Sequence, residues 1–96
     1  MKLYRLSRLA EADLGSIWEH SAANWGVDQA EAYLRDLQHA IETTAANPRL
    51  GRACDEIRAG YFKRSVGSHI VFYRLAGGVM EVIRILHQRM DFDRHL

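Results

Sequence analysis

The sequence predicts an α+β fold, in which an N-terminal strand precedes an antiparallel pair of helices packed on one face of a three- to five-stranded antiparallel sheet. Two observations lead to this prediction. Apolar residues recur at helical spacing through the first half of the chain, up to Asn47-Pro48. From Arg52 onward they form short runs rich in Val, Ile, Phe and Tyr, separated by glycine-containing turns. With 96 residues the chain has room for one domain with a thin core, so residues 1–96 are expected to form a single domain.

The first strand and the first helix are predicted from the start of the chain. Side chains alternate from Leu3 to Ser7, which fits a strand of about five residues, and Ser7 can cap the helix that follows. We expect Trp18 and Trp25, like Tyr33 in the second helix, to pack in the core, with an interface role as the alternative. Gly26 is expected to end the helix in a left-handed conformation. The apolar stripe of this helix comprises Leu14, Ile17, Trp18, Ser21 and Trp25.

A second helix is predicted to follow almost at once. Asp28 and Glu31 have the spacing of a capping box, with Asp in place of the usual Ser or Thr. Pro48 ends the helix, because proline disfavours helical geometry in the residue before it. Two helices joined by two or three residues must fold back on each other. The apolar stripe of the second helix comprises Ala30, Tyr33, Leu34, Leu37, Ile41 and Ala45.

Four strands are predicted in the second half of the chain, and their short links require antiparallel pairing. Alternation on the last strand puts one apolar set on each face, so this strand should be central. We expect Arg74 and Arg84 to project from the sheet face opposite the helices, making that face open, basic and aromatic. After Arg89 the tail is expected to form an irregular turn or a short helix. The predicted strands are Ala53–Arg58, Tyr61–Val66, His69–Leu75 and Val79–Leu86. The last one is expected to place Val79, Glu81, Ile83 and Ile85 on one face and Met80, Val82, Arg84 and Leu86 on the other.

Charge is divided unevenly along the chain, although the net charge is only +1. Residues 1–48 contain four Lys and Arg against seven Asp and Glu, whereas residues 49–96 contain nine against five. Eight of those nine cations are Arg, whose planar fork suits carboxylates, phosphates and protein interfaces. The pattern does not distinguish a nucleic acid from an acidic protein partner. No apolar run is long enough to span a membrane or to form an export signal, so the cytoplasm is the expected compartment.

Most enzyme chemistries lack a motif in this sequence. The single cysteine, Cys54, has no second thiol for a disulfide or a CxxC site, and is expected to be a small half-buried apolar residue. The five histidines have no HxxxH or HExxH spacing, so we expect neither a metal nor a cofactor. Ser65 and Ser68 lack the context of an activated nucleophile, and Gly77-Gly78 is not followed by a helix as a phosphate-binding loop would be.

Metal-free RNA cleavage is the catalytic alternative, because it needs a base, an acid and cations around the phosphorane. The residues that could supply these are His69, His87 and His95 with Arg58, Arg64, Arg84 and Arg89. No motif ties any two of them together. Arg58 and Arg64 could equally pair with Asp55 or Glu56 across strands, and Asp91 could hold Arg89 or Arg94.

Motifs along nearly the whole chain resemble those of the ParE-type toxins of the RelE/ParE superfamily. They are Leu6-Ser7, Ala12-Asp13-Leu14, Trp25-Gly26, Ala32-Tyr33-Leu34, Asn47-Pro48-Arg49-Leu50-Gly51-Arg52, Ile57-Arg58-Ala59-Gly60-Tyr61, His69-Ile70-Val71-Phe72-Tyr73-Arg74 and Ile83-Arg84-Ile85-Leu86-His87-Gln88-Arg89-Met90-Asp91. The resemblance implies the toxin of a type II toxin–antitoxin pair that inhibits DNA gyrase, blocks replication and is neutralised by a ParD-like antitoxin. It implies a protein inhibitor and not an enzyme.

The ribonuclease branch of the same superfamily cuts mRNA on the ribosome with basic residues and a C-terminal Tyr or His. This chain has Met90-Asp91 in the corresponding tail and only Lys63 as a strand lysine, so gyrase inhibition is preferred, and His95 keeps the ribonuclease alternative open. A module that binds an antitoxin without being toxic is a third possibility.

The predicted contacts fall into two groups. For the target we expect Arg84, His87 and Arg89 as contacts, with Arg58 and Arg64 as supporting cations. For the antitoxin we expect a groove between the helices and the sheet edge that involves Leu14, Trp18 and Tyr33, because surplus apolar residues on a small domain call for a covering partner. Direct sequence-specific binding of nucleic acid is not expected.

Overall fold

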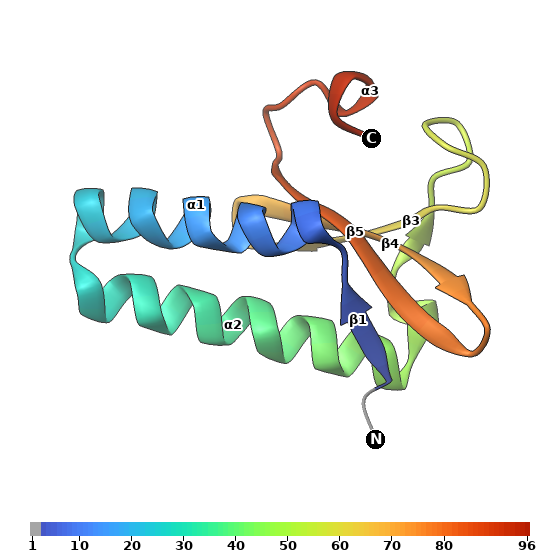
Figure 1. Cartoon of the computed structure of the whole chain (residues 1–96), viewed down its shortest axis with the longest axis horizontal. Helices are drawn as coiled ribbons and strands as arrows, with labels where there is room; N and C mark the ends of the chain where they lie inside the picture. The colour runs from blue at the N-terminus through green and yellow to red at the C-terminus, as the bar shows by residue number, and fades with distance from the viewer. Residues whose placement is uncertain (1–2) are drawn as a thin grey trace.

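The computed structural model describes residues 3–96, so Met1 and Lys2 lie outside the description, and it has the predicted α+β architecture (Figure 1). The helices are α1 (Arg8–Trp25), α2 (Val27–Ala46), the 3-10 helix η1 (Pro48–Leu50) and α3 (Phe92–His95). The strands are β1 (Tyr4–Leu6), β2 (Arg52–Ala53), β3 (Phe62–Val66), β4 (His69–Ala76) and β5 (Val79–His87). No helix of residues 3–96 is both long and apolar enough to cross a membrane.

The helical pair forms as predicted, but its connection is shorter. Ser7 caps α1, since its hydroxyl accepts a hydrogen bond from the Ala10 amide at 3.0 Å. Gly26 alone joins the helices, with φ at 93° and ψ at 162°, which is a positive φ outside the left-handed helical region. The predicted capping box is wrong: α2 begins at Val27 without a side-chain cap, because the one-residue link leaves Asp28 already inside the first turn.

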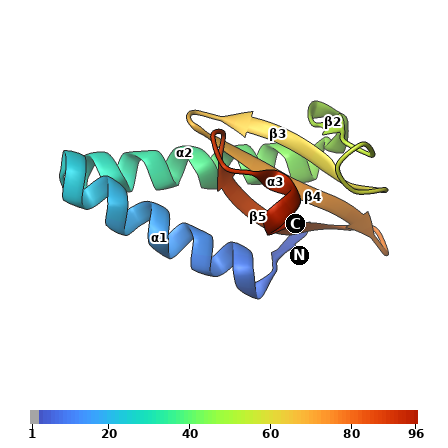
Figure 2. The same cartoon turned by 90° about the horizontal axis from the view of Figure 1, so that it is seen from above.

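The far end of the helical pair extends past the sheet, as both views show (Figures 1 and 2). This explains why the predicted core positions of Trp18 and Trp25 are wrong: their exposed fractions are 37% and 66%. The stripes bury Ile17 on α1 and Leu37 and Ile41 on α2, which lie where the sheet backs the helices. Helical spacing therefore identified the inward face, and the length of the sheet decided how far along it burial reaches.

The sheet has the order β1-β5-β4-β3-β2. Three pairs are antiparallel and β1 runs parallel to β5, which has two neighbours and is central as predicted. Glycines with positive φ form the two hairpin turns, Gly67 between β3 and β4, and Gly77 and Gly78 between β4 and β5.

A β-bulge changes the faces of β5. Phe72 pairs with Arg84 and Tyr73 with Val82, which leaves Ile83 as an extra residue. The predicted alternation is therefore wrong beyond Val82: Ile85 joins Met80 and Val82 in the core beneath the helices. The bulge also anchors α1, because the Ser7 hydroxyl donates a hydrogen bond to the Ile83 carbonyl at 2.6 Å.

A second, smaller core lies on the sheet face opposite the helices. Its centre is Cys54, Phe72 and Leu86, and the ring of Phe92 in the C-terminal segment meets the Phe72 ring edge-on at 5.0 Å between centroids. The predicted strand Ala53–Arg58 is wrong except for its first residue, because the chain turns after Cys54 to cover this core. Cys54 is fully buried, more than the half-buried position expected, and burial raises the pKa of its thiol.

Candidate functional site

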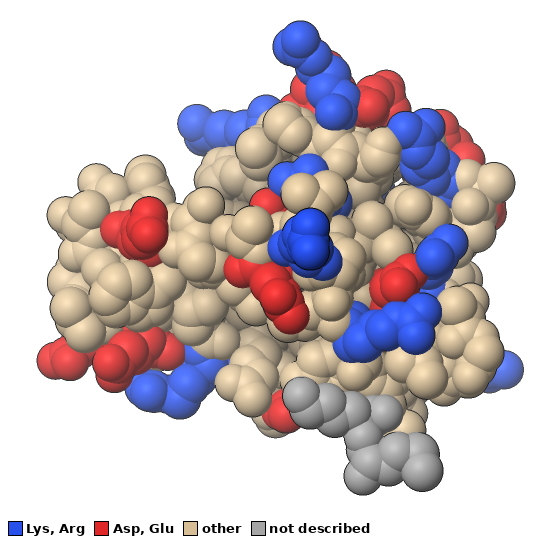
Figure 3. Space-filling view, viewed as in Figure 1, with Lys and Arg blue, Asp and Glu red and all other residues tan. Residues whose placement is uncertain are grey.

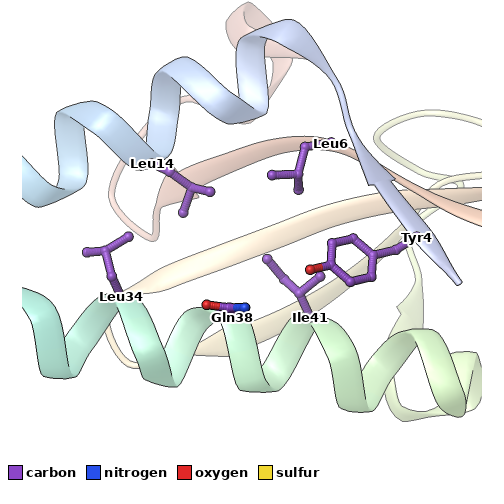
Figure 4. A pocket seen from close by; sticks show the side chains of 6 residues that line it. All are labelled: Tyr4, Leu6, Leu14, Leu34, Gln38 and Ile41. Carbon is purple, nitrogen blue, oxygen red and sulfur yellow. The ribbon is translucent and has the colours of Figure 1, made fainter. Parts of the chain in front are cut away.

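An apolar groove lies between the two helices and β1, at one edge of the sheet (Figure 4). Its volume is about 260 Å³. Figure 4 shows the side chains from α1 and β1 pointing toward those from α2 across the groove. One predicted antitoxin contact, Leu14, is among the lining residues, which are Tyr4, Leu6, Leu14, Leu34, Gln38 and Ile41. We call this feature the helix–β1 groove.

The other two predicted antitoxin contacts lie away from the lining of this groove. Trp18 is on α1, one turn beyond Leu14, with 37% of its surface exposed. Tyr33 instead holds the turn between β3 and β4: its hydroxyl is 3.2 Å from the Val66 carbonyl and accepts a hydrogen bond from the Ser68 amide at 3.2 Å. The alternation in β1, which turns Tyr4 and Leu6 to the same face, is the sequence signal that could have found these two lining residues, and the apolar stripe of the second helix could have found Leu34 and Ile41.

A second hollow, of about 330 Å³, lies between α1 and the paired ends of β4 and β5, and three histidines line it. His69 pairs with His87 across the strands, with ring centroids 5.3 Å apart and the rings edge to face. The Nδ1 atom of His69 is 2.6 Å from the Tyr33 hydroxyl. Burial lowers the pKa of His69, and the charges of His87 and His20 lower it further.

Arg84 is held inside the fold. Its Nε and Nη2 atoms donate to the two carboxylate oxygens of Asp13 at 2.8 and 2.9 Å, and its Nη1 atom donates to the His95 carbonyl at 3.0 Å. The hydrogen bonds that Arg84 donates to Asp13 raise the pKa of Arg84 above its ordinary value. Asp13 also accepts a hydrogen bond from the Ile85 amide at 2.9 Å, next to the bulge. The prediction that Arg84 projects from an open face is therefore wrong.

The C-terminal segment covers part of the face that was expected to be open. Arg84 binds it through His95, and Arg58 donates a hydrogen bond to the backbone oxygen of Leu96. Asp91 caps α3 by accepting from the Asp93 amide at 3.2 Å and makes no ion pair with Arg89 or Arg94 within residues 3–96. Tertiary contacts thus use two of the expected target-contact arginines to fix the tail.

The remaining target-contact candidates are spread over the molecule. His87 ends β5, and its Nδ1 atom accepts a hydrogen bond from the Arg89 amide at 3.1 Å, so these two residues stay together. Arg64 lies near the opposite sheet edge, where its Nη1 atom donates to the Thr44 hydroxyl at 2.9 Å. The predicted cross-strand pairs from Arg58 and Arg64 to Asp55 or Glu56 do not form among the described residues. Asp55 accepts instead from the Gly60 amide and closes its own loop.

Charge on the molecular surface follows the imbalance between the two halves of the sequence. Figure 3 shows acidic side chains at the far end of the helical pair, on the left, and most of the Lys and Arg toward the sheet and the C-terminal segment. On the sheet, Glu81 lies between two cations and accepts from Arg5 at 3.0 Å and from Arg74 at 2.6 Å. These hydrogen bonds, from Arg74 first, lower the pKa of Glu81. No group of three or more His, Cys, Asp or Glu side chains within residues 3–96 has the arrangement of a metal site.

Comparison with known proteins identifies the family. The family described as the ParE toxin of the type II toxin–antitoxin system parDE matches residues 4–92. The chain belongs to this family. A relative from Mycobacterium tuberculosis, Toxin ParE1, is 63% identical over 94 residues, which cover 97% of this chain and 96% of the relative. Toxin ParE1 of Caulobacter vibrioides is 51% identical over 96 residues, covering 100% of this chain and 99% of the relative.

A solved structure, described as the chromosomal ParDE TA system from P. aeruginosa, has the same fold with a TM-score of 0.79. The match covers 91% of this chain and 96% of the chain in the solved structure, and the two sequences are 19% identical. The fold and the family resemblance drawn from the motifs are both confirmed, and the chain is a ParE toxin of a type II toxin–antitoxin system by family.

Proposed function

We propose that this ParE toxin is neutralised by a ParD-like antitoxin that occupies the helix–β1 groove, and that the free toxin inhibits DNA gyrase and so blocks replication. The observation that carries the antitoxin part is the groove itself. Five of its six lining side chains are Tyr, Leu or Ile, and they come from three elements that leave a concave surface between them. A protein that inhibits gyrase must act in the cytoplasm, where bacterial DNA lies.

The shape of the groove suits an amphipathic segment of the partner. Such a segment inserts apolar side chains at regular spacing and leaves its polar face in water. Leu3, just before β1, and Trp18 on α1 are exposed and could extend the contact beyond the groove. An antitoxin that binds only the folded toxin also stabilises it, by about 4 kcal/mol at a thousandfold excess over its Kd.

The antitoxin proposal is tested by alanine substitutions on the groove. Leu14→Ala and Leu34→Ala remove side chains from opposite walls, and each is expected to weaken antitoxin binding by about 30-fold, since central interface residues contribute about 2 kcal/mol. Leu9→Ala is the matched control, because Leu9 is on the same helix and exposed but does not line the groove. Binding is measured by calorimetry with the cognate ParD-like antitoxin, after circular dichroism has shown that each variant is folded.

The same titration tests the contacts predicted from sequence. Trp18→Ala removes an exposed aromatic side chain, and Tyr33→Phe removes only the hydroxyl that supports the turn between β3 and β4. Unchanged affinity for Leu14→Ala and Leu34→Ala would remove the antitoxin from this groove. Unchanged affinity for the other two variants would remove only Trp18 and Tyr33.

The target proposal rests on family membership and on the pair at the end of β5. His87 and Arg89 lie beside each other, and Arg89 is exposed without an ion pair within residues 3–96. We assign no bond-making role to either residue, because the gyrase performs the chemistry and the toxin traps it. Arg58 and Arg84 are expected to act indirectly, by fixing the C-terminal segment.

A supercoiling assay with purified gyrase and ATP tests the target. The free toxin is expected to inhibit supercoiling and to trap cleaved DNA. Arg89→Ala should abolish this inhibition while leaving antitoxin binding intact. Arg35→Ala is the control: Arg35 is exposed on α2, and its substitution should change neither inhibition nor antitoxin binding. Undiminished inhibition by Arg89→Ala would remove Arg89 from the contact surface.

One observation favours ribosome-dependent RNA cleavage as a second candidate. His69 and His87 lie close enough to act as a base and an acid, next to the Tyr33 hydroxyl. Cut mRNA in a ribosome assay with normal supercoiling would establish this alternative, and His87→Ala should then abolish cleavage. Inactivity in both assays, with antitoxin binding retained, would leave a module that binds its antitoxin without being toxic.

A further inference from the structure

The far end of the helical pair exposes apolar side chains that the fold leaves in water. Trp25 ends α1 and Val27 begins α2, on either side of the single-residue link at Gly26, and 66% and 51% of their surfaces are exposed. The sheet does not cover this end, because the helices extend past it (Figures 1 and 2). Exposed tryptophan is typical of surfaces that bind another protein. We call Trp25, Gly26 and Val27 the helical tip.

The surroundings of the helical tip are acidic. From Leu9 to Leu34 the chain has five Asp and Glu and no Lys or Arg. Asp28 and Glu31 lie at the start of α2, and neither forms an ion pair within residues 3–96. Arg35, one turn after Glu31, is the first cation beyond this stretch. A partner that suits the helical tip therefore has apolar side chains with cations around them.

The other part of the same molecule has these properties. Residues 49–96, which we call the basic half, contain nine Lys and Arg against five Asp and Glu, an excess of four cations. Figure 3 shows most of the Lys and Arg over the sheet and the C-terminal segment, away from the helical tip. Three apolar side chains of the basic half are exposed, those of Leu50, Leu75 and Met90. The basic half thus offers both the charge and the apolar contacts that the helical tip requires.

The separation of charge decides how two copies attract each other. The longest dimension of the Cα trace is 37 Å, whereas salt at 0.1 M screens charges over about 10 Å, so a second molecule meets each end separately. The net charge of +1 causes little repulsion between whole molecules. Contact between two helical tips would bring like charges together, which opposes association. Contact between a helical tip and the basic half of another copy joins opposite charges.

We propose that the free toxin self-associates through the helical tip, as an antiparallel dimer in which each tip lies on the basic half of the other copy. A two-fold axis makes this contact twice and closes the assembly, so both copies of Trp25 are covered without open chains. The tip is small beside a standard interface of about 1,600 Å², so we expect a reversible dimer with a Kd above about 1 μM. The proposal goes beyond antitoxin and gyrase binding and depends on neither.

Sedimentation velocity of the purified free toxin tests the proposal, at protein concentrations from about 1 μM to 1 mM. The wild type should change from monomer to dimer as the concentration rises. Trp25→Ala should raise the Kd of the dimer by about 30-fold or more, the effect typical of removing a central interface tryptophan. Leu9→Ala is the matched control, because Leu9 is exposed on the same helix but belongs neither to the helical tip nor to the basic half.

Two changes test the pairing of opposite charges. Raising NaCl from about 0.1 to 1 M shortens the screening length from about 10 to 3 Å and should weaken the dimer. The double variant Asp28→Asn with Glu31→Gln should also weaken it, whereas the same variant would strengthen a contact between two acidic tips. Thermal unfolding checks that the variants are folded, and Trp25→Ala should unfold within about 4 °C of the wild type because its side chain is mostly exposed.

Several outcomes would overturn the proposal. A wild type that stays monomeric up to about 1 mM has no such dimer, and a Trp25→Ala variant that dimerises as tightly as Leu9→Ala places the contact elsewhere. Species that keep growing beyond a dimer would contradict the two-fold pairing, and tighter association of the uncharged double variant would assign a tip-to-tip contact. If the wild type is monomeric and Trp25→Ala loses affinity for a ParD-like antitoxin or loses gyrase inhibition, the helical tip binds that partner instead.

Discussion

Substitution of Asp13 tests the contact that connects α1, the bulge in β5 and the C-terminal segment. The Asp13 carboxylate accepts three hydrogen bonds, two from Arg84 and one from the Ile85 amide, at 2.8 to 2.9 Å. Only 13% of the Asp13 side chain and 14% of the Arg84 side chain are exposed. Asp13→Ala therefore leaves a largely buried guanidinium without its counter-charge and the Ile85 amide without an acceptor.

The expected loss is about 3 kcal/mol in the free energy of unfolding. Hydrogen bonds to charged groups contribute about 1.5–3 kcal/mol each, and the contributions of one network do not add fully. Removing one partner of a fully buried ion pair typically costs about 3–5 kcal/mol. We expect the lower end of that range for Asp13→Ala, because water still reaches this pair. For a domain of this size, such a loss lowers Tm by roughly 12–24 °C.

Urea unfolding monitored by circular dichroism measures the loss. Glu11→Ala is the control, because Glu11 is exposed in the first turn of the same helix and should cost at most about 0.5 kcal/mol. Asp13→Asn keeps the shape of the side chain but not its charge and should fall between the two. If Asp13→Ala costs no more than Glu11→Ala, the Arg84 pair does not stabilise the fold and our account of the tail is wrong.

Three further outcomes are expected from the structure. Gly51→Ala should lower the free energy of unfolding in urea by about 1–3 kcal/mol, because the new Cβ would lie 2.0 Å from the hydroxyl oxygen of buried Tyr73. Adding Tyr73→Phe should recover part of the loss. An unchanged urea midpoint for Gly51→Ala would contradict this packing. The pKa of His69 is lower in the folded chain than its ordinary 6.5, so the unfolded chain binds the extra proton first and stability should fall as the pH drops below about 6.5. His69→Gln should flatten the dependence of stability on pH in this range. If the dependence is as steep in the variant as in the wild type, another group causes it. Arg74 and Arg5 lower the pKa of Glu81, so the stability that Glu81 contributes is present above about pH 4.5 and is lost as the pH falls further. Glu81→Gln should therefore be less stable than the wild type at pH 7 but differ little from it at acid pH. A stability difference that stays constant with pH would refute the ion-pair explanation.

Local patterns in the sequence were enough to predict most of the elements. The spacing of Ile17, Leu37 and Ile41 identified the buried faces of both helices, because helical geometry repeats within a few residues. Gly67 and Gly77-Gly78 located the hairpins, because only glycine adopts positive φ there without strain. Leu14 lies on the inward stripe of α1 and lines the helix–β1 groove, while its contact with an antitoxin stays a prediction.

Predictions that depended on distant contacts failed. Nothing near Trp25 in the sequence tells how far the sheet extends beneath the helices, so its exposure could not be predicted. The strand expected at Ala53–Arg58 has suitable residues, but the chain turns there to cover Phe72 from the other face of the sheet. The bulge at Ile83 likewise arises from the pairing with β4 and is invisible in the alternation of β5 alone.

The sequence by itself determined the family, the order of helices and strands, and the faces that turn inward, since these depend on motifs and on interactions between near neighbours. Only the tertiary structure decided which arginines are available to a partner. Arg84 meets Asp13 across 71 residues of chain, which largely buries its guanidinium, and Arg58 meets Leu96 across 38, which ties its guanidinium to the C-terminal segment. Arg52 and Lys63, in contrast, are paired across β2 and β3 and form no ion pair within residues 3–96. The charge of an arginine is fixed by its chemistry, but its partner is fixed by the folding of distant segments against each other.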